Sequence, residues 1–185
     1  MNQLLEQNFA THRIETPVGD IDAQWDGAGK LCSCSFASHV ETCPEQATED
    51  TTCSLATAAG ELVQQRQQEL QRSFENYFRT GQLCWDLELL DWSPISPFHQ
   101  RVLRRCAAIP SGLTMSYAEL ARCAGSPLAA RAVGSAMARN PWPLIVPCHR
   151  VLGASGRLTG YSGAGGIDTK RRLLDWEQGQ PGIFS

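Results

Sequence analysis

The sequence lacks the features that mark membrane and exported proteins. No apolar run approaches the roughly 18 residues of a transmembrane helix. The first residues, MNQLLEQNFATHR, contain neither a basic segment nor a long apolar segment, so no secretory signal is predicted. Apolar residues make up 42% and charged residues 19% of the 185 residues, which is typical of a globular chain with one ordinary or two small domains. We expect a cytoplasmic protein with no membrane partner.

Paired cysteine motifs are also missing, although the chain has eight cysteines. No two of them have the C-x-x-C spacing, and a disulfide framework would suit a smaller secreted chain. Most are therefore expected to be small buried apolar residues. The alternative is a zinc site, with ligands drawn from a set of cysteines and histidines in the first half: His12, Cys32, Cys34, His39, Cys43 and Cys53. Their spacing fits no common zinc-finger pattern, so we expect no metal and no other cofactor.

Basic residues are scarce in the first half of the chain. Residues 1–92 contain 5 Lys and Arg against 15 Asp and Glu, a net charge of −10. Residues 93–185 contain 11 Lys and Arg against 4 Asp and Glu, a net charge of +7. This asymmetry predicts two units with these boundaries, the second facing a polyanion such as nucleic acid. Charge alone leaves a solvated basic surface as an equal alternative.

The first half reads as a small α+β unit. Alternating apolar residues and turn residues predict a hairpin over 12–25, a strand over 31–36, a polar loop over 40–54 and another strand over 83–92. Helical spacing predicts a helix over 55–79, which Gly81 ends. The residues expected to share its buried face are Leu62, Leu70, Phe74, Tyr77 and Phe78.

The second half is richer in helix signals. A helix from Phe98 is expected to end before Pro110, and a capping box at Ser116–Glu119 predicts a second helix. Ser126 and Pro127 predict the start of a third helix, which runs to Asn140. Two short helices joined by a tight turn resemble a helix-turn-helix.

The third helix is rich in small residues, including Ala130 and Ala132, with Arg131 between them. Small residues allow close approach to DNA, but core packing explains them equally well. A glycine-rich loop over 157–166 contains Tyr161 and lacks the spacing of a nucleotide-binding fingerprint. A last helix is expected to begin at Asp168 or Thr169 and to end at Gly179.

The stretch NPWPLIVPCHRV, residues 140–151, carries the chemistry. The apolar run 144–146 looks like a buried strand that ends at a proline and presents Cys148 followed by His149. A cysteine is nucleophilic only as its thiolate, which a nearby base or cation must favour. Neighbours on a strand point to opposite faces, so a bend would be needed to bring the two side chains together. A buried, inert cysteine is the alternative that this stretch leaves open.

These motifs together resemble the O6-alkylguanine-DNA alkyltransferase family. IVPCHRV after the Asn140-Pro141 pair is similar to that family's active-site signature, and further motifs follow the same order. They are Ser116-Tyr117-x-x-Leu120-Ala121, the helix Arg131-Ala132-Val133-Gly134 with Met137, Gly160-Tyr161-Ser162-Gly163, and Lys170-x-x-Leu173-Leu174-x-x-Glu177. The resemblance is strong over 93–179, whereas the first half matches only at Thr16–Gly19 and in layout.

The resemblance implies a role for each matching residue. Cys148 would accept the alkyl group, His149 would take its proton through a water, and Glu177 would orient that histidine. Asn140 would hold the active-site turn. Tyr117, with Ser116, Ala130 and Ala132, would face DNA, and Tyr117 would also donate a proton towards the leaving guanine. Arg131 would fill the gap left by the flipped nucleotide. The pocket for the base would involve Met137, Val151, Tyr161 and Ser162.

The resemblance also implies the fold and the reaction. The expected fold is an α+β chain with a small ribonuclease-H-like unit followed by a winged-helix-like unit containing the helix-turn-helix. The expected reaction is irreversible, single-use transfer of an alkyl group from O6-alkylguanine, and also from O4-alkylthymine, in double-stranded DNA to a monomeric protein. The loop between Ser162 and Lys170 is slightly longer than in many members, which puts the pocket lid and alkyl-size preference in question. Competing readings are a lesion-binding relative without the acceptor cysteine, a winged-helix regulator and a Cys–His hydrolase.

Overall fold

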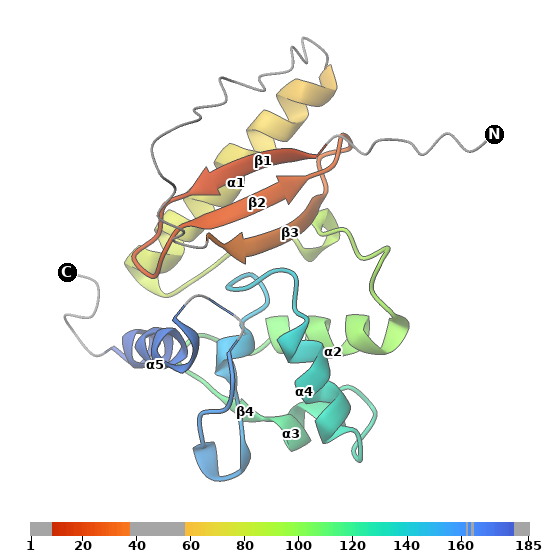
Figure 1. The fold of residues 1–185 in the computed structure, drawn as a ribbon, viewed down its shortest axis with the longest axis vertical. Coiled ribbons are helices and arrows are strands. Elements are labelled where there is room, and N and C mark those ends of the chain that lie inside the picture. The colour runs from red at the N-terminus through yellow and green to blue at the C-terminus, as the bar shows by residue number, and fades with distance from the viewer. Residues whose placement is uncertain (1–8, 38–57, 162, 164, 180–185) are drawn as a thin grey trace, which may run out of the picture.

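The computed structural model describes residues 9–37, 58–161, 163 and 165–179, which form two packed halves (Figure 1). In the first half, β1 (Ala10–Ile14), β2 (Ile21–Trp25) and β3 (Leu31–Phe36) form an antiparallel sheet in that order. The helix α1 (Ala58–Thr80) lies across one face of it. The predicted hairpin and the strand over 31–36 are confirmed, and the predicted loop over 40–54 lies outside the described residues.

Helix α1 buries one apolar stripe against the sheet. Val63, Leu70, Phe74 and Tyr77 are buried, and each large apolar side chain so removed from water contributes about 1.5–3 kcal/mol. The prediction that Leu62 belongs to this stripe is wrong: its side chain is 37% exposed, and Val63 takes the buried position. Leu62 instead lies at the edge of the stripe, where it packs over Gly29.

The end of α1 follows the prediction. Gly81 has a φ of +79° and its N–H donates to the Tyr77 carbonyl at 2.8 Å, which satisfies a carbonyl that the helix leaves free. The strand predicted over 83–92 is wrong, because this segment contains the short 3₁₀ helix η1 (Leu87–Leu89). The Asp86 side chain caps it by accepting from the Glu88 N–H at 2.9 Å, and only Leu90 bridges to β3, at Leu31.

The second half is a helical unit with a two-stranded parallel sheet. Its elements are α2 (Pro97–Ala107), β4 (Met115–Ser116), α3 (Tyr117–Cys123), α4 (Ala130–Ala138), η2 (Cys148–Arg150), β5 (Val151–Leu152), η3 (Ala154–Gly156) and α5 (Gly166–Glu177). Ser116 and Glu119 form the predicted capping box at the start of α3. Helices α3 and α4 pack against each other as a helix-turn-helix, and the predicted α+β class is confirmed.

Two predicted helix starts are wrong. Ser126 does not cap α4, because residues 126–129 form a turn in which the Ala129 N–H donates to the Ser126 carbonyl at 2.9 Å. Pro127 suits such a turn as well as it suits a first helical turn, so the sequence could not separate the two. Helix α5 begins before Asp168, at Gly166, and Gly165 precedes it with a left-handed φ of +75°.

The segment before Cys148 is held against the first half. Cys34 of β3 donates its N–H to the Pro141 carbonyl at 2.7 Å, and the Trp142 indole donates to the Leu31 carbonyl at 3.0 Å. The Trp142 ring also packs edge-on against Trp92, with 4.8 Å between centroids. The edge of β3 therefore positions the segment that leads into the candidate active site. The boundary between residues 92 and 93 stays a prediction.

Candidate active site

The chain approaches Cys148 through a buried turn, so the prediction of a strand over 144–146 is wrong. Asn140 is only 8% exposed, and its side-chain amide donates to the Val146 carbonyl at 2.8 Å. Its side-chain carbonyl accepts from the Trp142 N–H at 3.1 Å. These bonds hold Leu144 at a φ of +69°, which is costly for a branched residue. The role expected for Asn140, to hold the turn, agrees with this geometry.

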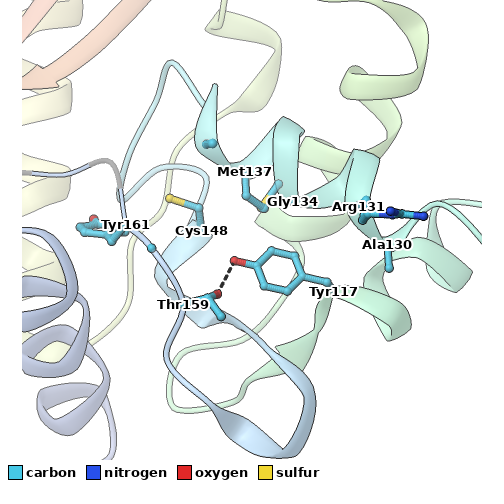
Figure 2. Close-up of a pocket in the computed structure, with 10 residues that line it drawn as sticks. Tyr117, Ala130, Arg131, Gly134, Met137, Cys148, Thr159 and Tyr161 are labelled. Atoms are coloured by element: carbon cyan, nitrogen blue, oxygen red, sulfur yellow. Dashed lines mark hydrogen bonds between the residues drawn. The ribbon is translucent and has the colours of Figure 1, made fainter.

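The turn delivers Cys148 to one end of a cavity of about 680 Å³ (Figure 2). The thiol lies between Tyr161 and Met137, and Tyr117 of α3 extends its hydroxyl towards the same region. Arg131 lies on α4 at the far end, with its guanidinium directed outward. The cavity is lined by Tyr117, Ala130, Arg131, Gly134, Met137, Ala138, Cys148, Thr159, Gly160 and Tyr161. The cavity therefore opens along the helix-turn-helix and reaches the thiol.

His149, the residue after Cys148, forms a buried pair with Glu177. Nε2 of His149 lies 2.9 Å from Oε1 of Glu177, and both side chains are fully buried. A ring nitrogen that faces a carboxylate carries the proton, which leaves Nδ1 as the basic nitrogen. Nδ1 is buried and has no hydrogen-bond partner among the described residues. It is therefore available to accept a proton through a bridging water.

The Glu177 carboxylate accepts bonds from several other groups. The Arg150 guanidinium donates from Nη2 to Oε1 at 2.7 Å and from Nε to Oε2 at 3.0 Å. Its Nη1 donates to the Ile109 carbonyl at 2.6 Å. The Gly112 N–H donates to Oε2 at 3.2 Å, and the Tyr77 hydroxyl of α1 donates to Oε1 at 2.5 Å. The Glu177 carboxylate on α5 is thus hydrogen-bonded both to the segment at Cys148 and to α1.

Burial and pairing together set the charges of this site. Burial raises the pKa of Glu177, but the bonds from His149 and Arg150 outweigh it and hold that pKa well below its ordinary value. Burial lowers the pKa of His149 against the opposing pull of Glu177, so its imidazole is neutral at pH 7. Burial raises the pKa of Cys148, and Asn140 and the Lys170 charge offset part of that shift. The resting thiol is therefore protonated, and the imidazole of the next residue is neutral.

Other residues expected at the site lie around this centre. The Ser116 hydroxyl caps α3 by accepting from the Glu119 N–H. Ala132 is exposed on α4 and does not line the cavity. The Val151 side chain is fully buried in β5, and its carbonyl accepts from Lys170. Ser162 lies outside the described residues.

Two further residues of the site were given no role from the sequence, although Lys170 belongs to a motif that carries the resemblance. Lys170 is 1% exposed, and its Nζ donates to the Val151 carbonyl at 2.7 Å and the Thr159 carbonyl at 3.4 Å. It ties together both ends of the loop between β5 and Thr159, and its charge favours the Cys148 thiolate. The Thr159 hydroxyl lies 2.9 Å from the Tyr117 hydroxyl. A lysine within KRR looks solvated, so nothing in the sequence indicated its burial.

Metal ligands do not gather in the described part of the chain. No group of three or more His, Cys, Asp or Glu side chains is placed to hold an ion in residues 9–37, 58–161, 163 and 165–179. Cys34 is buried in β3, whereas His39, Cys43 and Cys53 of the zinc alternative lie outside these ranges.

Comparison with known proteins identifies the family. The profile described as "6-O-methylguanine DNA methyltransferase, DNA binding domain" matches residues 97–179. The crystal structure of Mycobacterium tuberculosis OGT in complex with DNA is 34% identical, with a TM-score of 0.63, over 94% of this chain and 95% of that one. The chain belongs to the O6-methylguanine DNA methyltransferase family. The family prediction is confirmed, and with it the predicted fold, a C-terminal helix-turn-helix unit after a smaller α+β unit.

Relatives match mainly in the second half of the chain. A Mycobacterium bovis methylated-DNA–protein-cysteine methyltransferase is 57% identical over 81 residues, 44% of this chain and 48% of that protein. One of the same name from Methanosarcina acetivorans is 44% identical over 109 residues, 59% of this chain and 67% of that protein. The matched segment thus spans about half the length of the mycobacterial relative. No helix among the described residues has the length and apolarity to cross a membrane.

The lowered pKa of Glu177 predicts how the free energy of unfolding depends on pH. Because its folded-state pKa lies below the ordinary value of 4.5, the carboxylate stabilises the fold above that pH and loses this contribution as pH falls. E177Q leaves the Arg150 charge without its partner, so it should cost about 3–5 kcal/mol near pH 7.

Urea unfolding of wild type and E177Q across acid and neutral pH measures this difference. The difference in unfolding free energy between the two proteins should shrink as the pH falls from about 6 to about 3. Over this range the Glu177 carboxylate becomes increasingly protonated in the unfolded state. The matched control is E75Q, which removes an exposed carboxylate from α1. A difference between wild type and E177Q that stays constant with pH contradicts the assignment.

Proposed function

We propose that this protein repairs DNA by direct reversal, taking the alkyl group of O6-alkylguanine onto its own Cys148. The observation that carries the proposal is a buried His149–Glu177 pair whose Nδ1 has no partner among the described residues, next in the chain to a thiol that lines a cavity along a helix-turn-helix. Family membership supports it, and a relative matched along about half of its length is named a methylated-DNA–protein-cysteine methyltransferase. The substrate is double-stranded DNA, acted on by a monomer in the cytoplasm.

Binding begins with the helix-turn-helix. The net charge of +7 over residues 93–185 attracts phosphates, so binding weakens as salt increases. Ala130 at the start of α4 and Gly134 one turn later are small enough to let the helix approach the minor groove. An alkyl group on O6 of guanine is inaccessible within the base stack, so the nucleotide is rotated out into the cavity. Arg131, exposed at the cavity mouth, fills the space that it leaves.

The chemical step transfers the alkyl group to sulfur and, in net terms, one proton from Cys148 to the guanine. His149 takes the Cys148 proton through a water, and Glu177 stabilises the resulting imidazolium. The sulfur forms a bond to the alkyl carbon as the bond from that carbon to O6 breaks. Tyr117, whose hydroxyl is held by Thr159 on the cavity wall, donates a proton to the departing guanine. The proton held by His149 then replaces it through solvent. The product is a thioether, which no group in the cavity reverses, so each molecule acts once and no cofactor is consumed.

Alternative functions account for less of the structure. A winged-helix regulator has no need of a buried His149–Glu177 pair next to a cysteine that lines a cavity. A Cys–His hydrolase does not need a cavity formed by a helix-turn-helix. A lesion-binding protein without the acceptor is disfavoured because Cys148 is present and reaches the cavity. O4-alkylthymine remains part of the proposed substrate range.

The decisive test is the mass of the protein after reaction with a duplex that carries one O6-methylguanine. The chain should gain the mass of one methylene, once, on the peptide that contains Cys148. C148A should gain nothing and still bind the lesion. C123A, which removes an exposed cysteine of α3, should react like wild type. Transfer to another residue, or repeated turnover, contradicts the proposal.

Arg131 should matter only when the nucleotide must leave a duplex. R131A should repair duplex DNA about tenfold to hundredfold more slowly, because unstacking a base costs a few kcal/mol. Its reaction with the free base O6-benzylguanine, which needs no rotation, should keep the wild-type rate. R79A, an exposed arginine of α1, is the matched control. An equal loss with both substrates would show that Arg131 supports the site itself.

A further inference from the structure

Among the described residues, the Glu177 carboxylate receives one bond from the first half of the chain. His149, Arg150 and Gly112 donate to it from nearby elements of the second half. The remaining donor is the hydroxyl of Tyr77 on α1, at 2.5 Å from Oε1. Oε1 is also the oxygen that faces Nε2 of His149. A side chain of the first half thus contacts the atom that orients the proposed base.

Tyr77 is fixed in place by its surroundings. It is fully buried, and its ring packs edge-on against Trp176 at 5.1 Å and Phe78 at 5.0 Å between centroids. Trp176 precedes Glu177 on α5, so the aromatic contacts and the hydroxyl bond join the same two helices. The ring packing alone would hold α1 against α5. The hydroxyl adds a directed hydrogen bond to a charged oxygen, which packing does not require.

We propose that Tyr77 is a positioning residue for the proton acceptor: its hydroxyl fixes Oε1 of Glu177 and withdraws part of its charge, which sets how strongly Glu177 supports His149. The first half of the chain thereby completes the reactive centre as well as packing against it. The inference rests on the proposed function only in assigning Cys148 as the alkyl acceptor. Its test measures the reactivity of the thiol, which needs no DNA.

The direction of the effect follows from the shared oxygen. Without the Tyr77 hydroxyl, more negative charge stays on Oε1, and Glu177 stabilises the imidazolium of His149 more strongly. The base then takes the Cys148 proton at lower pH. Arg150, Lys170 and Tyr161 also act on this network, and replacing the Tyr77 hydroxyl leaves all of them unchanged.

The experiment follows the rate of carboxamidomethylation of Cys148 by iodoacetamide against pH, read on the Cys148 peptide by mass spectrometry. In Y77F the rising part of the rate-against-pH curve should move to lower pH by about half a unit. At a fixed pH on that part of the curve, the rate should increase about threefold. Difluorotyrosine placed at position 77 keeps the bond but donates more strongly, so the same part of its curve should move to higher pH. S73A is the matched control, because it removes another hydroxyl of α1, which donates to the Cys84 carbonyl.

Each outcome decides between positioning and packing. Opposite displacements for the two Tyr77 variants, with S73A at the wild-type position, support the proposal. If the rising part of the rate-against-pH curve moves in neither variant, the proposal is overturned, even if Y77F melts at a lower temperature. The difluorotyrosine variant retains the ring and the bond, so it remains informative if Y77F does not fold. Failure of the wild type to accept a methyl group from DNA would contradict the proposed function without changing these displacements.

Discussion

A single buried carboxylate determines how this protein is assembled. Glu177 carries its charge in the interior, where an unpaired charge is too costly to persist. It therefore has to be surrounded by donors, and these come from α1, from the residues before β4 and from the turn at Cys148. When α5 docks, it joins the two halves and orients His149 at the same time. Folding and assembly of the proposed base are consequently one event.

Burial also explains why the Cys148 thiol has low reactivity before substrate binds. The thiol of Cys148 is raised in pKa by its apolar surroundings, and the imidazole of His149 is lowered. Both groups are neutral at rest, so the sulfur has little reactivity towards ordinary electrophiles. A substrate that places an alkyl carbon against the sulfur makes the proton transfer productive. The cavity is lined by residues of α3 and α4, which lie in the half of the chain with a net charge of +7, so the proposed substrate would enter from that side.

Local signals in the sequence predicted the parts of the fold that depend on local chemistry. The capping box at Ser116 and the stop at Gly81 are confirmed because each is decided within a few residues. The run 144–146 was misread as a strand, because burial on all sides gives the same apolar pattern in a strand and in a turn. The turn is dictated by the Asn140 amide, which replaces the missing sheet partners of Trp142 and Val146.

The site was predicted through its motif residues, and its supporting residues were not. Cys148, Tyr117 and Arg131 line one cavity, as the resemblance implied. Lys170, although a motif residue, and Tyr77 were given no role at the site, because their roles arise from contacts between segments far apart in the chain. Tyr77 was predicted only as part of an apolar face, since a periodic pattern records burial and carries no information about where a hydroxyl points. Contacts of this kind become visible only in the folded chain.

Glu177 holds His149 as a neutral base with its proton on Nε2, which leaves Nδ1 without a partner among the described residues. Nitrogen-15 NMR of the His149 imidazole, assigned by comparison with H149Q, tests it most directly. At pH 7 the account predicts a neutral ring with Nε2 protonated and Nδ1 unprotonated, which gains its second proton only below the ordinary histidine pKa. An imidazolium at pH 7, or a proton on Nδ1, would contradict it.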